Sequence, residues 1–200
     1  HINKAEIKRI RRAFYALCTH IDHQLRLVLG TLREEGLLED AILLFTSDHG
    51  DMLGNHGLWA KRLFYEGSAN VPMILVGGRN KRVEHHSVDH RLVGWRDIMP
   101  TLLDLAEIDI PKTVEGLSMV DSKKRESLYG ECGEGHVATR MLRDERYKLI
   151  YYPTGNHLQL FDLQKDPNEM VDLSRYDEHK PKLEHLTKIL IGELYDEDLG

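Results

Sequence analysis

Apolar residues recur every three or four positions along the first 35 residues, a spacing that places side chains on one face of an α-helix. The residues with this spacing are Ile7, Ile10, Phe14, Leu17, Ile21, Leu25, Val28 and Leu32. Gly36 follows the last of them and suits a helix C-terminus. The short apolar run Ala41 to Phe45 then favours a strand buried on both faces of a parallel sheet. A helix followed by such a strand is half of an α/β repeat.

The middle of the chain alternates irregular and regular stretches. Residues 46–70 are rich in Gly, His, Asp and Asn, and Val71 to Val76 predicts a second strand that ends at a Gly-Gly pair. Residues 97–106 predict a helix with Asp97 as its N-cap. These elements continue the α/β pattern up to about residue 120.

The pattern of predicted elements changes from about residue 121. Short strands are predicted at 127–129, 137–142, 147–152 and 157–163, and Pro153-Thr154-Gly155-Asn156 is a hairpin turn signal. An amphipathic helix is predicted over 181–195. We therefore expect two domains: an α/β part at 1–120, and an antiparallel sheet with a helix at 121–200.

Composition narrows the class of protein. The 200 residues carry 27 Lys and Arg against 33 Asp and Glu, and the net charge of −6 argues against general nucleic-acid binding. No apolar run approaches the roughly 20 residues of a membrane span. The chain begins His1-Ile2-Asn3 without Met, so we expect it to be part of a longer protein. The cellular compartment of that protein stays an open question. Two cysteines are too few for a disulfide framework, and Cys18 is predicted to lie in the core.

The chemistry-bearing segment follows the first predicted strand. It reads Thr46-Ser47-Asp48-His49-Gly50-Asp51. Ligands of open α/β sheets bind beyond the carboxyl ends of strands, where Asp48 and His49 offer a carboxylate and an imidazole to one cation. The alternative is an acidic turn with an exposed His49. Two adjacent ligands are too few to hold an ion by themselves.

A cationic side chain lies twelve residues further on. Lys61 sits in an irregular segment that can fold back over the strand end, where an ammonium group would stabilise a transferring anionic group. The alternative is a solvated loop charge. His56 in the same loop either lines a pocket or packs within the loop.

Several phrases together resemble the sulfatase family of the alkaline phosphatase superfamily. They are FTSDHGDMLGNHGLWAKRLFYEGSANVPMILVGG, DIMPTLLDLAEIDIP, EGLSM, RDERYKLIYY and LQLFDLQKDPNEMVDLS, in family order. The resemblance implies the C-terminal part of an alkaline-phosphatase-like α/β sandwich, followed by a small antiparallel subdomain. The implied activity is hydrolysis of a small-molecule or carbohydrate sulfate ester.

The resemblance implies a role for each matching residue. Asp48 and His49 match the metal-binding pair, and His49 is similar to the choline-sulfatase and phosphonate-monoester-hydrolase branches. Lys61 matches the lysine that contacts the sulfate group, and His56 is a weaker candidate for substrate binding. The implied cofactor is Ca²⁺, although an imidazole ligand leaves Mn²⁺, Mg²⁺ and Zn²⁺ open.

The nucleophile of the family is missing from the chain. Sulfatases attack with a formylglycine made from the first residue of a Cys/Ser-x-Pro-x-Arg motif, and neither Cys18 nor Cys132 begins one. We therefore expect the nucleophile upstream of His1, no turnover by the 200 residues alone, and weak metal binding. Exposed apolar surface and self-association are also expected.

Other interpretations stay open at this point. A phosphonate monoester hydrolase or phosphodiesterase would share Asp48, His49 and Lys61, and a non-catalytic binding or scaffold protein would keep the fold with a degenerate site. A globular domain with a surface His cluster is a third alternative, although a solvated loop explains those histidines better. They are His85, His86 and His90. The identity of the ester and the oligomeric state stay open.

Overall fold

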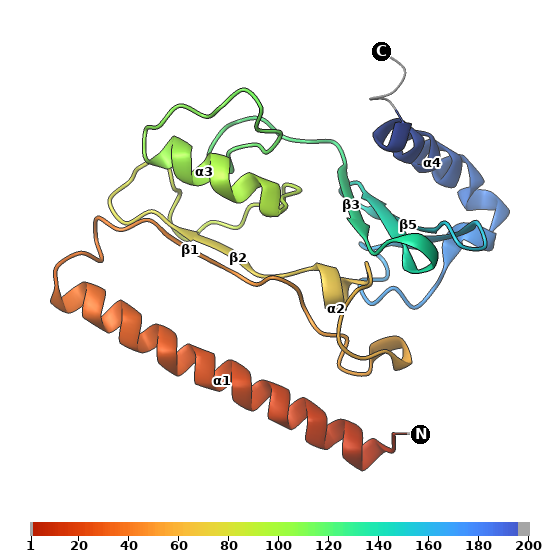
Figure 1. The fold of residues 1–200 in the computed structure, drawn as a ribbon, viewed down its shortest axis with the longest axis horizontal. Helices are drawn as coiled ribbons and strands as arrows, with labels where there is room; N and C mark the ends of the chain where they lie inside the picture. Colours follow the sequence, from red (N-terminus) through yellow and green to blue (C-terminus); the bar gives the residue numbers. More distant parts are fainter. Residues whose placement is uncertain (1, 196–200) are drawn as a thin grey trace. The chain divides into compact units, whose positions relative to one another are not determined.

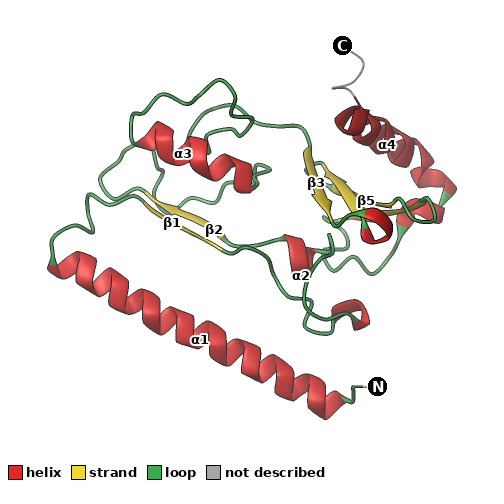
Figure 2. Cartoon of the chain, viewed as in Figure 1, coloured by secondary structure: helices red, strands yellow, loops and turns green. Residues whose placement is uncertain are grey.

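The computed structural model describes residues 2–195 and divides the chain into two compact units. The first unit joins residues up to 61 with 71–87, and the second joins 62–70 with 88 onward. Figure 1 and Figure 2 show the mixed α/β composition expected from the sequence. The predicted boundary near residue 120 stays a prediction, and residues 88–120 group with the C-terminal sheet. Within residues 2–195, no helix combines the length and the apolar character that a membrane crossing requires.

The first unit begins with the long helix that the apolar spacing predicts. Helix α1 spans Lys4–Glu34. Asn3 Oδ1 accepts hydrogen bonds from the Ala5 and Glu6 amides at 2.9 and 3.0 Å, and Glu6 Oε2 accepts one from the Asn3 amide at 2.8 Å. This reciprocal capping box explains why the helix starts there.

Helix α1 buries none of its own residues. Leu17 is 62% exposed, and Cys18 is exposed as well. The expectation that Cys18 lies in the core is therefore wrong. The apolar spacing correctly predicts a helix, but its apolar face is only partly covered: Phe14 and Leu25 are half-buried, whereas Leu17 and Ile21 are exposed.

The two strands of the first unit form a small antiparallel ribbon. Strand β1 spans Leu43–Thr46 and strand β2 spans Met73–Val76, with Leu43 opposite Val76 and Thr46 opposite Met73. The parallel, doubly buried strand expected from the apolar run is not observed, since β1 is half-buried and its described partner is antiparallel. After β2, Gly78 has φ +52°, and a Cβ there would lie 2.2 Å from the Glu39 carbonyl oxygen.

The second unit contains the predicted antiparallel sheet. Its strands are β3 (Leu128–Cys132), β4 (Thr139–Arg143), β5 (Tyr147–Tyr152) and β6 (His157–Asp162), in that spatial order. Helix α4 (Lys180–Tyr195) packs on one face. The core between them comprises Leu142, Leu149, Leu160, Leu186 and Leu190.

Shorter helices complete the unit. Helix α2 spans Glu66–Ala69 and helix α3 spans Ile98–Leu105. Five 3-10 turns are formed among the described residues: Asn55–Gly57 in the first unit, and Trp95–Asp97, Gly135–Val137, Leu173–Arg175 and Asp177–His179 in the second.

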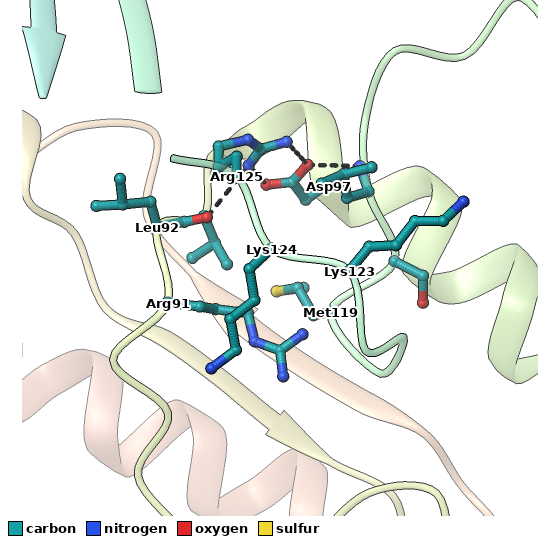
Figure 3. A pocket seen from close by; sticks show the side chains of 10 residues that line it. Arg91, Leu92, Asp97, Met119, Lys123, Lys124 and Arg125 are labelled. Atoms are coloured by element: carbon teal, nitrogen blue, oxygen red, sulfur yellow. Dashed lines mark hydrogen bonds and ion pairs between the residues drawn. The ribbon is translucent and has the colours of Figure 1, made fainter. Parts of the chain in front are cut away.

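Asp97 does not cap α3 as the sequence predicts. A 3-10 turn precedes the helix, so the side chain of Asp97 reaches back and accepts hydrogen bonds from the Gly94 and Leu117 amides, each at 2.8 Å. It also forms a two-pronged ion pair with Arg125 (Figure 3). Burial raises the pKa of the Asp97 carboxyl, but the hydrogen bonds from Arg125, Gly94 and Leu117 outweigh burial and hold this pKa below its usual range.

Candidate functional site

Asp48 and His49 lie two and three residues beyond the carboxyl end of β1. The turn is closed locally, because Ser47 Oγ donates to the His49 carbonyl oxygen at 2.9 Å and the His49 amide donates to Asp48 Oδ1 at 3.0 Å. The Asp48 side chain is 75% exposed, whereas that of His49 is 34% exposed. Short-range hydrogen bonds thus present both side chains at the strand end.

The two possible ligand atoms face one another. His49 Nε2 lies 3.2 Å from Asp48 Oδ2, and His49 Nδ1 lies 2.7 Å from the Gly50 carbonyl oxygen. A carbonyl can only accept, so Nδ1 carries the proton and donates to it. The other ring nitrogen, Nε2, faces Asp48 Oδ2.

The electrostatics favour an ionised carboxylate next to this imidazole. Desolvation raises the pKa of the Asp48 carboxyl. Attraction to His49 and hydrogen bonds from the His49 amide and Ser47 lower this pKa by more than desolvation raises it. The net effect places this pKa below its usual range. Asp48 is therefore a carboxylate at neutral pH.

The pair fits a divalent cation as part of a ligand set. Two ligands with bonds of about 2.0–2.4 Å to one ion at a right angle stand roughly 2.8–3.4 Å apart. The Asp48 Oδ2 to His49 Nε2 separation of 3.2 Å falls within that interval. Among the described residues, no group of three or more His, Cys, Asp or Glu side chains could hold a metal ion. The chain thus contributes two candidate ligands, and weak metal binding by it alone stays a prediction.

The loop that carries His56 and Lys61 is held in an unusual backbone conformation. Leu53, His56, Ala60 and Arg62 all have positive φ, a conformation that non-glycine residues adopt only where the surroundings impose it. The buried Met52 amide donates to the Ala60 carbonyl oxygen at 2.9 Å, which closes the loop at its base. Lys61 therefore lies between two left-handed residues.

A contact with α1 supports the same loop. Arg11 Nε donates to the Leu53 carbonyl oxygen at 2.8 Å, and Arg11 Nη2 donates to Asn55 Oδ1 at 3.3 Å. Both His56 and Lys61 are exposed. The structure brings Asp48 and His49 into contact, and His56 and Lys61 lie in the loop that follows them in the same unit.

Sequence reasoning missed a buried charge cluster in the second unit. Lys148 on β5 is 1% exposed and bonds to Glu66 and Glu169. The available signal was a lysine inside an otherwise apolar strand, because lysine is almost never fully buried without a partner.

The weaker sequence candidates do not form a site. His20 and His23 are exposed on α1, and the three histidines of residues 85–90 are exposed in a loop, as expected for a solvated segment. A cavity in the second unit lies beside the Asp97–Arg125 pair, between Arg91 and Lys124 (Figure 3). Its volume of about 10 Å³ admits a single water molecule and no sugar.

Comparison with known proteins decides the family. Residues 54–196 match the family model described as N-sulphoglucosamine sulphohydrolase, C-terminal. An arylsulfatase of Clostridium perfringens is 40% identical to the chain over 206 residues, which cover all of this chain and 43% of that protein. The chain belongs to the sulfatase family. It spans less than half the length of this curated sulfatase relative.

Solved structures place the sulfatase chain in the same fold. A 2-O GAG sulfatase superposes with a TM-score of 0.91 at 27% identity, over 99% of this chain and 46% of that one. A phosphonate monoester hydrolase from Silicibacter pomeroyi superposes with a TM-score of 0.84 at 25% identity, over 96% of this chain and 42% of that one. The expected alkaline-phosphatase-like fold is confirmed.

Proposed function

We propose that the complete protein hydrolyses sulfate esters of small molecules or carbohydrates, with Asp48, His49 and Lys61 in its active site. The observation that carries the proposal is the ionised Asp48 carboxylate, which faces Nε2 of a fixed His49 ring at the end of β1, in a chain of the sulfatase family. Sulfate-ester hydrolysis requires a site that binds an anion and stabilises charge on the oxygen that leaves.

Asp48 Oδ2 and His49 Nε2 would hold a divalent cation together with ligands outside the described residues. The cation would be Ca²⁺, with Mn²⁺, Mg²⁺ and Zn²⁺ as alternatives, because one of the two ligands is an imidazole. When bound, such an ion polarises the ester and offsets its negative charge. The chain's own contribution is to orient the His49 ring through the Gly50 carbonyl, so that Nε2 faces Asp48, and to keep Asp48 ionised.

Lys61 supplies the second positive charge. Its ammonium group would donate to a sulfate oxygen and to the oxygen of the leaving group, and so lower the cost of charge that develops as the S–O bond breaks. The nucleophile belongs outside these residues. We propose a formylglycine upstream of the chain, because neither cysteine here begins a Cys-x-Pro-x-Arg motif.

A phosphonate monoester hydrolase is the second candidate. It is favoured by the likeness to the Silicibacter pomeroyi enzyme and by the imidazole at His49. Sulfate monoesters and phosphonate monoesters each carry one negative charge, so one cationic site suits both. A scaffold protein with a degenerate site is the non-catalytic alternative.

The test compares substrates and one matched pair of variants of the complete protein. Hydrolysis of an aryl sulfate is expected to exceed that of an aryl phosphonate monoester. Lys61→Ala should lower kcat by about 100-fold, since one lost charge-stabilising donor costs roughly 10²–10³ in rate. Lys81→Ala removes another exposed lysine of the same unit and should leave kcat unchanged.

Three results would change this assignment. Faster cleavage of the phosphonate than of the sulfate would favour the second candidate. No turnover of either substrate would favour the scaffold. Equal kcat for Lys61→Ala and Lys81→Ala would remove Lys61 from the active site.

A further inference from the structure

Residues 52–61, which we call the Lys61 loop, fold back on themselves. Two hydrogen bonds join the two limbs of this loop: the Met52 amide donates to the Ala60 carbonyl oxygen at 2.9 Å, and the Gly54 amide donates to the Leu58 carbonyl oxygen at 2.8 Å. The lysine itself comes directly after the second limb. A displacement of the first limb is therefore passed on to the lysine.

The tip of the Lys61 loop is closed as well. The Asn55 amide donates to the Met52 carbonyl oxygen at 2.8 Å, and the Leu58 amide donates to the Asn55 carbonyl oxygen at 2.9 Å. A Cβ at Gly54 would stand 3.0 Å from the Trp59 ring, so this ring packs closely on the glycine. These contacts connect successive parts of the loop, so a support at one residue acts on the whole loop.

The backbone of the Lys61 loop is strained at three residues that are not glycine. Leu53, His56 and Ala60 have positive φ angles of 50°, 54° and 61°. Such conformations persist only where the surroundings over-determine them, and they cluster at functional positions. A contact that reaches one of these residues from outside the loop therefore helps to maintain its shape.

Arg11 on helix α1 makes such a contact. Its Nε donates to the Leu53 carbonyl oxygen at 2.8 Å, and its Nη2 donates to Asn55 Oδ1 at 3.3 Å. Both donors belong to one planar guanidinium group, so together they fix the orientation of the first limb as well as its distance from the helix. Arg11 is half-buried, although α1 as a whole buries none of its residues. The helix, the loop and Lys61 all belong to the first compact unit.

The bond from Arg11 meets a specific need at Leu53. The Leu53 amide donates to Asp51 Oδ1 at 2.9 Å, and the Leu53 carbonyl oxygen accepts from Arg11. Both polar groups of this strained residue are thus bonded to side chains rather than to a regular backbone ladder. A hydrogen bond from a charged donor is stronger than one between neutral groups. Loss of Arg11 therefore removes a strong restraint where the backbone is strained.

We propose that Arg11 is a positioning residue: it holds Leu53 and Asn55 and thereby sets where the Lys61 loop presents its lysine. This inference rests on the proposed role of Lys61 in sulfate-ester hydrolysis. It assigns helix α1 a part in catalysis although Arg11 itself does not touch the substrate.

The first test measures the hold on the loop without using activity. In Arg11→Met of the complete protein, exchange of the Met52, Gly54 and Leu58 amides should accelerate by about 10-fold or more, because the loop loses a charged hydrogen-bond donor. Methionine is a good helix former, so α1 itself should be preserved.

The matched control for this test is Arg12→Met. Arg12 is the next residue of α1 and is exposed, and within residues 2–195 it makes no hydrogen bond to the Lys61 loop. It removes the same charge from the same helix, so exchange in the Lys61 loop should stay at the wild-type rate.

The second test measures whether Arg11 acts through Lys61. Arg11→Met should lower kcat by about 10-fold or more with KM within about threefold, because a small displacement of a catalytic group has effects of this size. Arg11→Lys keeps one charged donor and should recover part of the loss, since an ammonium group lacks the planar fork that serves both acceptors. In a Lys61→Ala background, Arg11→Met should change kcat by less than about threefold, because the two losses are one loss.

The outcomes separate this inference from the proposed function. An equal fold-loss from Arg11→Met with and without Lys61 would mean a general structural role and would overturn the inference. Unchanged exchange in the Lys61 loop, or faster exchange with an unchanged kcat, would overturn it too. If the protein cleaves no aryl sulfate, the proposed function fails, and the exchange experiment alone then decides whether Arg11 holds the loop.

Discussion

The ion pair between Asp97 and Arg125 should be the most sensitive single interaction in the segment that joins α3 to the C-terminal sheet. Asp97 is 1% exposed and the Arg125 side chain is 10% exposed. Arg125→Met keeps most of the side-chain volume but leaves the Asp97 carboxylate buried with two amide donors, from Gly94 and Leu117. Removal of one partner of a buried pair costs about 3–5 kcal/mol. The two remaining amide donors place the expected cost near the lower limit, at about 3 kcal/mol.

This cost translates into a local opening that can be measured. At about 1.4 kcal/mol per factor of ten, 3 kcal/mol corresponds to roughly a 100-fold increase in the open population. Amide hydrogen exchange at Leu117, whose N–H donates to Asp97, should accelerate by about that factor in Arg125→Met at neutral pH. Arg79→Met breaks an exposed pair with Glu39 in the other unit and should leave exchange at Leu117 unchanged.

The pH dependence gives a second check with a definite sign. The pKa of Asp97 in the folded protein is lower than that of an unfolded aspartate. The pair therefore contributes its full stability above the unfolded pKa, near 4, and loses it as the pH falls through the folded pKa. The difference between wild type and Arg125→Met should shrink in that acidic window. Exchange at Leu117 within about threefold of wild type at neutral pH would refute the argument.

Two further predictions concern stability, and urea unfolding followed by circular dichroism would measure both. Gly78→Ala should destabilise the protein by about 2 kcal/mol or more, because its Cβ would collide with the Glu39 carbonyl oxygen. Gly155 also has a positive φ, of +87°, but open space surrounds it, so Gly155→Ala should cost about 1 kcal/mol. Leu186→Ala should cost about 2–5 kcal/mol because the side chain is fully buried against the sheet, and Ile191→Ala on the exposed face of α4 should cost far less. Equal losses within either pair would contradict the packing described.

The sequence predicts elements better than it predicts pairing. Tyr147 to Tyr152 was expected as a strand over the residues that form β5, because its flanks carry clear turn signals. The run Ala41 to Phe45 was expected in a parallel sheet, yet β1 pairs antiparallel with β2. An apolar run indicates that a segment tends to be buried, but it does not indicate which strand pairs with that segment. The partner of β1 lies 27 to 33 residues further along the chain, outside the local pattern.

The same difference between local and long-range contacts applies to the functional residues. The turn that presents Asp48 and His49 is accessible to sequence reasoning, because the contacts that arrange it lie within residues 47–50, and the role of the two residues stays a prediction. The sequence predicts Asp97 as a helix cap, but the partner of its side chain, Arg125, is 28 residues further along the chain. Local hydrogen bonds are encoded by neighbouring residue types, whereas long-range ion pairs are not.

The two halves of the candidate site should therefore respond differently to remote change. The ligand pair Asp48 and His49 is held by its own turn, so substitutions in the C-terminal sheet should leave its geometry alone. Lys61 lies in a longer loop, which is supported by the Met52–Ala60 hydrogen bond and by the contact of Arg11 on α1 with Leu53. Loss of the Arg11 side chain, 42 residues before Leu53, should then disturb the loop that carries Lys61 and leave the Asp48–His49 turn unchanged, because the hydrogen bonds that close this turn join residues 47–50 to one another.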